Sequence, residues 1–501
     1  MRHTIAALLM MSVAVSGAPS AQEARLRIGE ALEAMGGVNA LQQFGPVRVD
    51  VIGHGYALEQ SERPEGPWLA SYSQRTETRD AARRHLVRRV QTRNWSAPDW
   101  SPTAPVLVVT DGIAARRAGE RWLPGTSIDL AAAADAFDLA PERILLTARD
   151  AADLRLVPAR SLQGNLNHGL RFSWHGQTLT LFLNGHTHLP TMLEIVRDDT
   201  FGIWGDVTER RWYSFWALEP GGVWYPRQVT TDWNGLPFSD ETVLGLTPQA
   251  SLDEADLAVP AEVRTAFTKG LERPIGFGAI HLDPMRAIEI SPDVVMLPGS
   301  WNVLLVRQAD GVVVIEAPIS AQYSTEVIAY ASRRFPRAAI KAVVTTSDAW
   351  PHIGGVREYV ARGVPVYRLD LNGPILDRLV AAPRGLSPDA LARSKRKPSW
   401  QTLAGRTVIG TGDTRVELMP VRGELGERMM FAWLPGPKLL YASDMVQRDR
   451  TGGFFWVGLL AEVEGVVRRE RLETIERVAA MHLPPTPFAE ITSAVAKIRG
   501  R

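Results

Sequence analysis

The sequence predicts two folded regions of different class, a curved antiparallel β-sheet or half-barrel followed by an α/β domain. Up to about residue 250, many short strands alternate with Asp-Gly, His-Gly, Asn-Gly and Gly-Gly turns, which is typical of an antiparallel meander. From about residue 287 onward, short apolar strands alternate with helical segments, which is the pattern of an α/β domain. The chain of 501 residues is also longer than one ordinary domain.

The first 21 residues predict a secretory signal peptide. A short basic head is followed by a mostly apolar run over residues 4–15 and then by small residues. The apolar run is too short to cross a bilayer, which needs about 20 apolar residues. We therefore expect export to the periplasm or beyond, with no transmembrane segment.

The overall composition narrows the classes of partner and chemistry. Lys and Arg together number 56 against 55 Asp and Glu, so the balance of charge gives no support for a nucleic-acid partner. The sequence contains no cysteine, which excludes disulfides, thiolate metal ligands and cysteine nucleophiles. Nothing in the sequence predicts an oligomeric state.

Residues 22–250 predict the β domain, and the polar, helical residues 251–275 predict a connector. Within the β domain, residues 182–225 resemble periplasmic lipoprotein-carrier domains, on the strength of the segments 189–190, 212–216 and 222–226. The resemblance implies an unclosed barrel that holds an apolar ligand such as an acyl chain. The many tryptophans of this region are then expected to line the barrel or fill its core.

A strand that ends at Thr346 is followed by a short loop, by His352 at the start of a helix, and by Gly354 and Gly355. In metallo-β-lactamase-fold enzymes the same place carries the motif His-x-His-x-Asp-His-x-Gly-Gly. A strand-to-helix loop of this kind brings several ligands to one or two zinc ions. The stretch resembles that motif at His352 and at both glycines.

Residues 276–501 show further parts of the same family's order. A hairpin ends at Glu316, where the family often places an acidic residue, and a strand over 438–442 leads to Asp444, where the family has its bridging aspartate. His482 follows a long helix predicted over 459–481, at the place of the family's last histidine. The resemblance implies an αββα sandwich and a metal site of His352, Asp444 and His482 that holds at most one zinc ion.

Four other ligand positions of the family are occupied by different residues. Ser347 and Ala349 stand at the first two histidine positions, Pro351 at the aspartate, and Glu424 near the upstream histidine. Ala and Pro side chains cannot bind metal, and Ser is a poor zinc ligand. Asp348 and Glu424 remain candidates for orienting or deprotonating a metal-bound water.

Two functions follow, and the sequence leaves both open. One is a metal-dependent hydrolase that acts on a small-molecule substrate of unknown class through a mononuclear zinc site. The other is a non-catalytic binding or scaffold protein with a degenerate hydrolase domain and a β domain that binds an apolar ligand. In it, the three retained residues serve only as a helix cap, a loop acceptor and a helix-end histidine. A β-lactam hydrolase proper is disfavoured by the replaced ligands.

Overall fold

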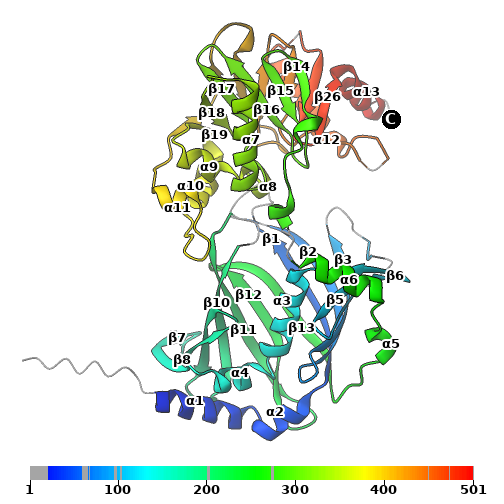
Figure 1. Ribbon diagram of the computed structural model, residues 1–501, viewed down its shortest axis with the longest axis vertical. Helices are drawn as coiled ribbons and strands as arrows, with labels where there is room; N and C mark the ends of the chain where they lie inside the picture. The colour runs from blue at the N-terminus through cyan, green and yellow to red at the C-terminus, as the bar shows by residue number, and fades with distance from the viewer. Residues whose placement is uncertain are drawn as a thin grey trace, which may run out of the picture.

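The computed structural model describes residues 21–501 except 59–65, 67, 95–98, 102–103, 200–202, 272–275, 450, 473 and 500–501. The predicted signal peptide therefore lies, apart from its last residue, outside the described residues. Figure 1 shows two bodies stacked along the long axis of the molecule, one formed by the first part of the chain and one by the last. The strands that end by Pro248 form one sheet, and those that begin at Ile288 form two others.

The first sheet, here called the large sheet, is antiparallel throughout and has thirteen strands among the described residues. Their order across the sheet is β6-β5-β4-β3-β2-β1-β13-β12-β11-β10-β9-β8-β7. The strands are β1 (Val47–Ala57), β2 (Leu69–Asp80), β3 (His85–Asn94), β4 (Val106–Thr110), β5 (Ile113–Ala118), β6 (Arg121–Pro124), β7 (Arg155–Leu162), β8 (Asn165–Trp174), β9 (Gln177–Asn184), β10 (Pro190–Asp198), β11 (Asp206–Leu218), β12 (Trp224–Trp233) and β13 (Leu236–Pro248). A large antiparallel sheet is confirmed, while the half-barrel shape stays a prediction.

Helices lie against the large sheet, and they are α1 (Ala21–Ala34), α2 (Val38–Phe44), α3 (Ser127–Asp138), α4 (Ile144–Asp150), α5 (Glu254–Leu257) and α6 (Ala261–Gly270). The start of α3 is fixed by a capping box, in which Thr126 and Asp129 each bind the other's backbone N–H. The segment predicted as a connector packs on the sheet, because Val263 of α6 joins an apolar cluster with Val87 and Val108.

The rest of the chain forms the part that we call the sandwich. Its seven-stranded sheet is β14 (Ile288–Ser291), β15 (Val294–Leu297), β16 (Val303–Gln308), β17 (Gly311–Ile315), β18 (Ile340–Val344), β19 (Val366–Leu369) and β20 (Trp400–Leu403). Its six-stranded sheet is β21 (Thr407–Ile409), β22 (Val416–Pro420), β23 (Met430–Leu434), β24 (Leu439–Tyr441), β25 (Arg477–Ala480) and β26 (Leu483–Pro487). Its helices are α7 (Ala321–Arg334), α8 (Trp350–Ile353), α9 (Val356–Ala361), α10 (Gly373–Ala381), α11 (Ala390–Ser394), α12 (Val457–Arg469) and α13 (Phe488–Arg499), with short 3₁₀ turns at Gly276–Ala279, Pro284–Arg286, Asp370–Asn372 and Gly412–Thr414.

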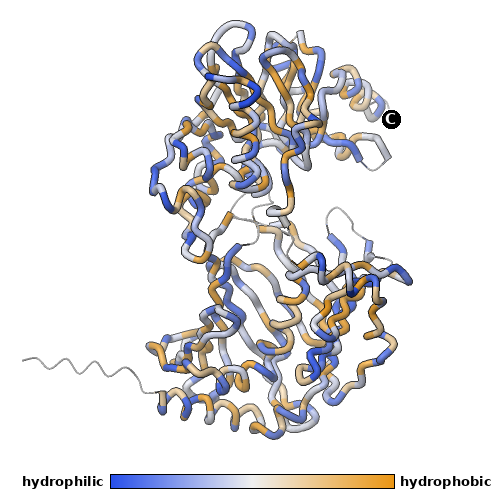
Figure 2. Tube along the Cα trace, in the orientation of Figure 1, coloured by the Kyte–Doolittle hydropathy of each residue, from blue (hydrophilic) through white to orange (hydrophobic). Residues whose placement is uncertain are grey.

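The sandwich has four layers because its strands are apolar on both faces. Alternate residues of β17 point in opposite directions, so that Val314 packs with α7 and α9 while Ile315 packs with the second sheet. In β23, Ala432 joins the core between the sheets and Phe431 packs with α12 and α13. Figure 2 shows the hydrophobic stretches concentrated in these strands, between the two helical layers. The α/β class and the layered sandwich are thus as predicted.

One predicted element of the sandwich was wrong. The helix expected over residues 459–481 ends at Arg469, and β25 then runs parallel to β24. β25 includes the apolar residues 478–480, which the sequence analysis had assigned to the end of the predicted helix. His482 therefore follows a buried strand rather than a helix.

Specific contacts join the sandwich to the large sheet near residue 206. The Asp206 carboxylate accepts hydrogen bonds from the backbone N–H groups of Gly385 at 2.6 Å and Leu386 at 3.1 Å. The Arg378 guanidinium lies 4.4 Å above the ring of Trp204. Within the described residues, no helix has the length and apolar character needed to cross a membrane.

Candidate metal centre

Three elements of the sandwich bring the predicted ligands together. His352 lies on α8, while Asp444 and His482 follow β24 and β25. Because β24 and β25 are parallel neighbours, the residues after them lie at the same edge of the sheet. Figure 1 places α8 at the end of the sandwich that faces the large sheet.

One ligand atom from each of His352, Asp444 and His482 lies within 4.8 Å of the other two. His352 Nε2 is 3.6 Å from Asp444 Oδ2, and His482 Nε2 is 3.2 Å from Asp444 Oδ1. Ligands about 2.0–2.2 Å from a tetrahedral zinc ion are roughly 3.3–3.6 Å apart. The two nitrogen–oxygen distances are close to this spacing, and all three ligand atoms lie within 4.8 Å of one another, so the side chains are near enough to hold one zinc ion.

The hydrogen bonding of the three side chains also bears on whether they can bind a metal ion. Among the described residues, His352 Nδ1 is buried and has no hydrogen-bond partner, while Asp444 Oδ1 is buried with His482 Nε2 at 3.2 Å. A carboxylate beside two imidazole nitrogens offers the oxygen and nitrogen donors that a zinc ion takes. In usual zinc sites, a ligating histidine donates its second ring N–H to an acceptor. His352 departs from this, because its Nδ1 has no such acceptor among the described residues. The side chains of Asp444 and His482 are 29% and 28% exposed, so the site is open on one side to a small molecule.

The two glycines of the motif explain how α8 packs so closely. A Cβ on Gly354 would meet the Ile319 carbonyl oxygen at 2.5 Å, and one on Gly355 would meet Ser324 Oγ at 2.0 Å. Larger residues at these positions would push α8 away from the chain that leads into α7. The glycines thus allow His352 to be buried at the edge of the sandwich.

Burial and neighbouring charges set the protonation of the three side chains. Burial lowers the pKa of His352 to about 4, so its imidazole is neutral at pH 7, as a metal ligand requires. Burial opposes the charge of Asp444, but the neighbouring His352 and His482 outweigh it and lower the pKa of the carboxyl. Burial likewise opposes the charge of His482, and Asp444 outweighs it and raises the pKa of His482.

Glu316 lies beneath the site, at the end of β17. Its side chain is fully buried, and burial raises the pKa of its carboxyl to about 8. The Thr346 hydroxyl is within hydrogen-bond reach of Glu316 Oε1 and, at 2.8 Å, of Ser443 Oγ. Glu316 and Thr346 therefore connect the loop that leads to His352 with the loop that carries Asp444.

The two residues predicted to act on a water lie outside the group of three ligand atoms. Asp348 is buried in an ion pair with Arg428, whose Nε donates to Asp348 Oδ2 at 2.8 Å. Burial raises the pKa of Asp348 against the opposing effect of Arg428. Glu424 is exposed on its loop. Catalytic roles for Asp348 and Glu424 stay predictions, and for Asp348 one carboxylate oxygen is already bound.

Two residues near the site were not predicted to lie there. The Trp301 ring lies 6.0 Å from the ring of His482, and Arg428 is the partner of Asp348. Trp301 precedes β16 and Arg428 precedes β23, far along the chain from the residues that they contact. Only the tertiary structure brings these pairs together, because no local spacing links them.

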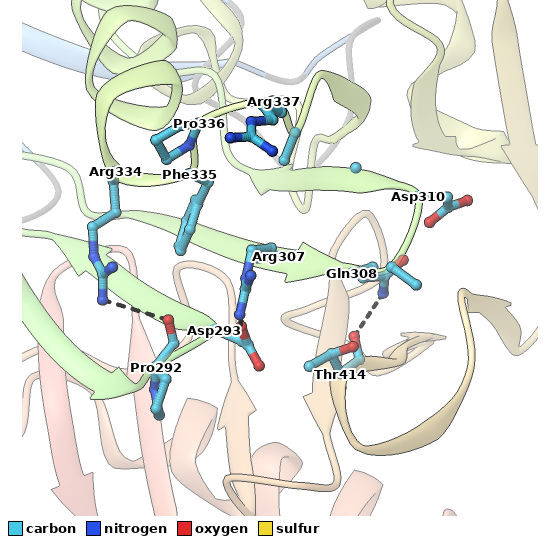
Figure 3. Close-up of a pocket in the computed structure, with 13 residues that line it drawn as sticks. Pro292, Asp293, Arg307, Gln308, Asp310, Arg334, Phe335, Pro336, Arg337 and Thr414 are labelled. Atoms are coloured by element: carbon cyan, nitrogen blue, oxygen red, sulfur yellow. Dashed lines mark hydrogen bonds and ion pairs between the residues drawn. The ribbon is translucent and has the colours of Figure 1, made fainter.

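A groove of about 710 Å³ lies elsewhere in the sandwich (Figure 3). It runs between the β16–β17 turn and the end of α7. Arg307 pairs with Asp293 and Arg334 with Glu289, while the Gln308 amide donates to the Thr414 carbonyl at 2.6 Å. These charged groups neutralise one another, and none of the three candidate ligands lines the groove.

Comparison with solved structures finds metallo-β-lactamase-fold proteins. A metallo-β-lactamase from Pontibacter korlensis is similar over 43% of this chain and 99% of its own, with 16% identity and a TM-score of 0.33. A metallo-β-lactamase from Hirschia baltica covers 42% of this chain and 96% of its own, with 14% identity and a TM-score of 0.32. A stereoselective inverting sec-alkylsulfatase from a Pseudomonas species covers 42% of this chain and 40% of its own, with 17% identity and a TM-score of 0.32.

No protein-family model matches the sequence, and no curated protein matches it. The similarities to solved structures extend over less than half of this chain. At these identities no activity is transferred from the neighbours to this protein.

Proposed function

We propose that this protein is a metal-dependent hydrolase that uses a single zinc ion held by His352, Asp444 and His482. The convergence of three ligand atoms within 4.8 Å of one another carries the proposal. Two imidazoles and one carboxylate form a known zinc set that leaves a position open for water or substrate. Zinc bound there supplies a Lewis acid and lowers the pKa of a coordinated water towards 7.

The surrounding residues support this assignment by fixing the ligands. Burial keeps His352 neutral, so its imidazole needs no deprotonation before it binds a cation near neutral pH. The buried Glu316–Thr346–Ser443 contacts hold the loop before Asp444 in place. Trp301 beside His482 provides an apolar wall next to the open side of the site. The substrate is a small molecule, and its class is left open.

Metal content and one histidine substitution test the proposal. Purified wild-type protein is expected to carry about one zinc per chain by elemental analysis, whereas His482→Ala loses the metal on dialysis because only two ligands remain. His186→Ala is the matched control, since His186 is exposed on the β9–β10 turn of the large sheet. That variant should keep its zinc. Hydrolysis of ester, lactone, phosphate and sulfate probes is then compared among the three proteins.

A non-catalytic binding protein is the alternative, and one observation favours it. Asp348, the acidic residue nearest to the motif, is bound by Arg428 instead of being free to act on a water. The alternative predicts no bound zinc even after the protein is equilibrated with it, and no change on His482→Ala. Either result would rule out the hydrolase.

We also propose that the protein is exported and that residues 1–21 are removed. The basic head, short apolar run and small residues of this segment support the proposal. Intact-mass measurement on protein from the native host should give a mature N-terminus between Pro19 and Glu23. A mass that includes Met1 would contradict it.

A further inference from the structure

The large sheet contains a second buried cluster of charged side chains, which is separate from the candidate metal centre. A cavity of about 320 Å³ lies between the sheet and α3, and residues of β1, β2, β3, β11, β12 and β13 line it. Figure 1 shows α3 lying across this part of the sheet. The volume is at the lower end of the range for small-molecule pockets.

One wall of the cavity is a network of ion pairs on β2 and its neighbours, here called the β2 network. It contains Arg75, Arg79 and Arg88 with Glu77, Glu142 and Glu241. Arg79 binds Glu142 through two nitrogens at 2.9 and 3.0 Å, and Arg75 binds Glu241 at 2.6 Å. Positive and negative groups are equal in number, so the wall is strongly polar without a net charge.

The opposite wall has the same character, and we call it the β11 network. It contains Arg197 and Arg211 with Asp135 and Glu209. Because β1, β13 and β12 lie between β2 and β11, the two networks flank a strip of these three strands. The side chains of Val49, Val51, Val229 and Val243 form an apolar part of that strip, which also includes Thr231, Ser239 and Glu241.

Tyr213 and Arg75 leave hydrogen-bonding atoms unused at this cavity. Tyr213 is 5% exposed and lines the cavity, and among the described residues its hydroxyl has no hydrogen-bond partner. Arg75 Nε is likewise buried with no partner among the described residues. A buried polar group without a partner lowers stability, so native proteins keep few of them. These two atoms point to a ligand with hydroxyl or carbonyl groups.

The charge balance selects the class of that ligand. An anion or a cation would leave one uncompensated charge in a buried, already neutral network, which is unfavourable. A hydroxyl group is both donor and acceptor, so it can bind a guanidinium and a carboxylate side by side without breaking their ion pair. A long acyl chain would find the apolar strip on only one side of the cavity, with charged walls on two others.

We propose that this cavity binds a neutral, polyhydroxylated small molecule of the size of a mono- or disaccharide. Its hydroxyls meet the β2 and β11 networks and Tyr213, while its C–H face rests on the valine strip. Phe238, which also lines the cavity, offers an aromatic surface at its edge. This site does not depend on the metal centre, so either proposal can fail without the other.

The test is calorimetric titration of the full-length protein with neutral sugars and with charged or apolar counterparts. Glucose, galactose, N-acetylglucosamine and maltose are compared with gluconate, glucosamine and laurate. We expect saturable binding of at least one neutral sugar. Gluconate and glucosamine should bind at least about tenfold more weakly than glucose, because the neutral networks offer no opposite charge to balance that of the ligand. Absence of saturable sugar binding, or binding of laurate alone, would overturn the proposal.

Two variants separate a binding site from a structural network. Tyr213→Phe removes only the hydroxyl and should raise the sugar Kd about five- to tenfold, without lowering the melting temperature of the free protein. Tyr330→Phe on α7 is the control and should change neither. A fall in melting temperature with unchanged sugar affinity would mean that the hydroxyl is structural.

Glu241→Gln tests the charge argument directly. Glu241 is 38% exposed at the cavity, so the substitution leaves a positive surplus in the β2 network with little risk to folding. The variant should then bind gluconate better than the wild type does, while Glu262→Gln on the exposed start of α6 should not. Unchanged preference between glucose and gluconate would contradict the assignment of the cavity to neutral ligands.

Discussion

The two buried clusters of titratable groups in this protein differ in how their charges are matched. In the large sheet, the carboxylates of the β2 network are paired with guanidinium groups, as Glu77 is with Arg75, Arg79 and Arg88. In the sandwich, Asp444 lies between the imidazoles of His352 and His482, and among the described residues no guanidinium or ammonium group pairs with it. A matched cluster suits a neutral ligand, whereas a carboxylate beside two imidazoles suits a cation.

The largest effect is expected from breaking the matched cluster. Arg79→Ala leaves Glu77 and Glu142 as buried, partly unpaired carboxylates, and should reduce the free energy of unfolding by about 3–5 kcal/mol. Urea unfolding measures the change. Arg83→Ala, which removes an exposed pair with Glu254, should cost less than about 1 kcal/mol. Equal effects of the two substitutions would show that the buried pairs of Arg79 contribute no more to stability than an exposed ion pair.

A pH-dependent effect is expected from Glu316 beneath the metal centre. Its pKa of about 8 in the folded protein lies above the ordinary value of 4.5, so the folded state binds a proton that the unfolded state has released. This contribution is present below pH 4.5 and is lost as the pH rises through 8. Glu316→Gln does not titrate, and its stability relative to the wild type should therefore increase between pH 5 and pH 8 by on the order of 3 kcal/mol.

The measurement for Glu316 is urea unfolding of metal-free protein at both pH values. Glu262→Gln, with an exposed carboxyl on α6, serves as the control and should show no such pH dependence. A constant difference between Glu316→Gln and the wild type would show that Glu316 is ionised in the folded state.

Zinc should stabilise the sandwich and leave the large sheet unchanged. A ligand that binds only the folded state adds about 2.7 kcal/mol at a hundredfold excess over its Kd. Hydrogen exchange should therefore slow in β24, β25 and α8 when zinc is added, but not in β2 or β11. Equal protection of both regions would mean that the metal binds elsewhere or that the two regions unfold together.

The smallest effect concerns the contact between the two regions. Asp206→Ala removes two hydrogen bonds to the 385–386 backbone and should cost about 1–2 kcal/mol, since a charged acceptor is involved. Calorimetry should then show the unfolding of the large sheet and that of the sandwich moving apart in temperature. Asp150→Ala, which removes an exposed pair with Arg149, is the control and should leave the profile unchanged.

The ligand residues were predictable because their signal is local or keeps a fixed order along the chain. His352 lies within a short strand-loop-helix pattern with two glycines, Asp444 follows an apolar strand, and His482 was placed by the order of the family it resembles, although the helix expected before it is in part the strand β25. The structure brings all three together. The partner of Asp348 was not predictable, because Arg428 is 80 residues away and follows no shared pattern.

Sequence by itself determined the alternation of strands in the large sheet, the layered α/β class of the sandwich and the identity of the three candidate ligands. The strands and the α/β class follow from side-chain periodicity, while the layered sandwich and the three ligands follow from the resemblance to the metallo-β-lactamase fold. Only the tertiary structure decided that Arg75 and Glu77 on β2 face the cavity opposite Glu209 and Arg211 on β11. The physical reason is that alternation tells which residues share a face, whereas strand order and register, set by contacts far apart in the chain, decide what that face encloses.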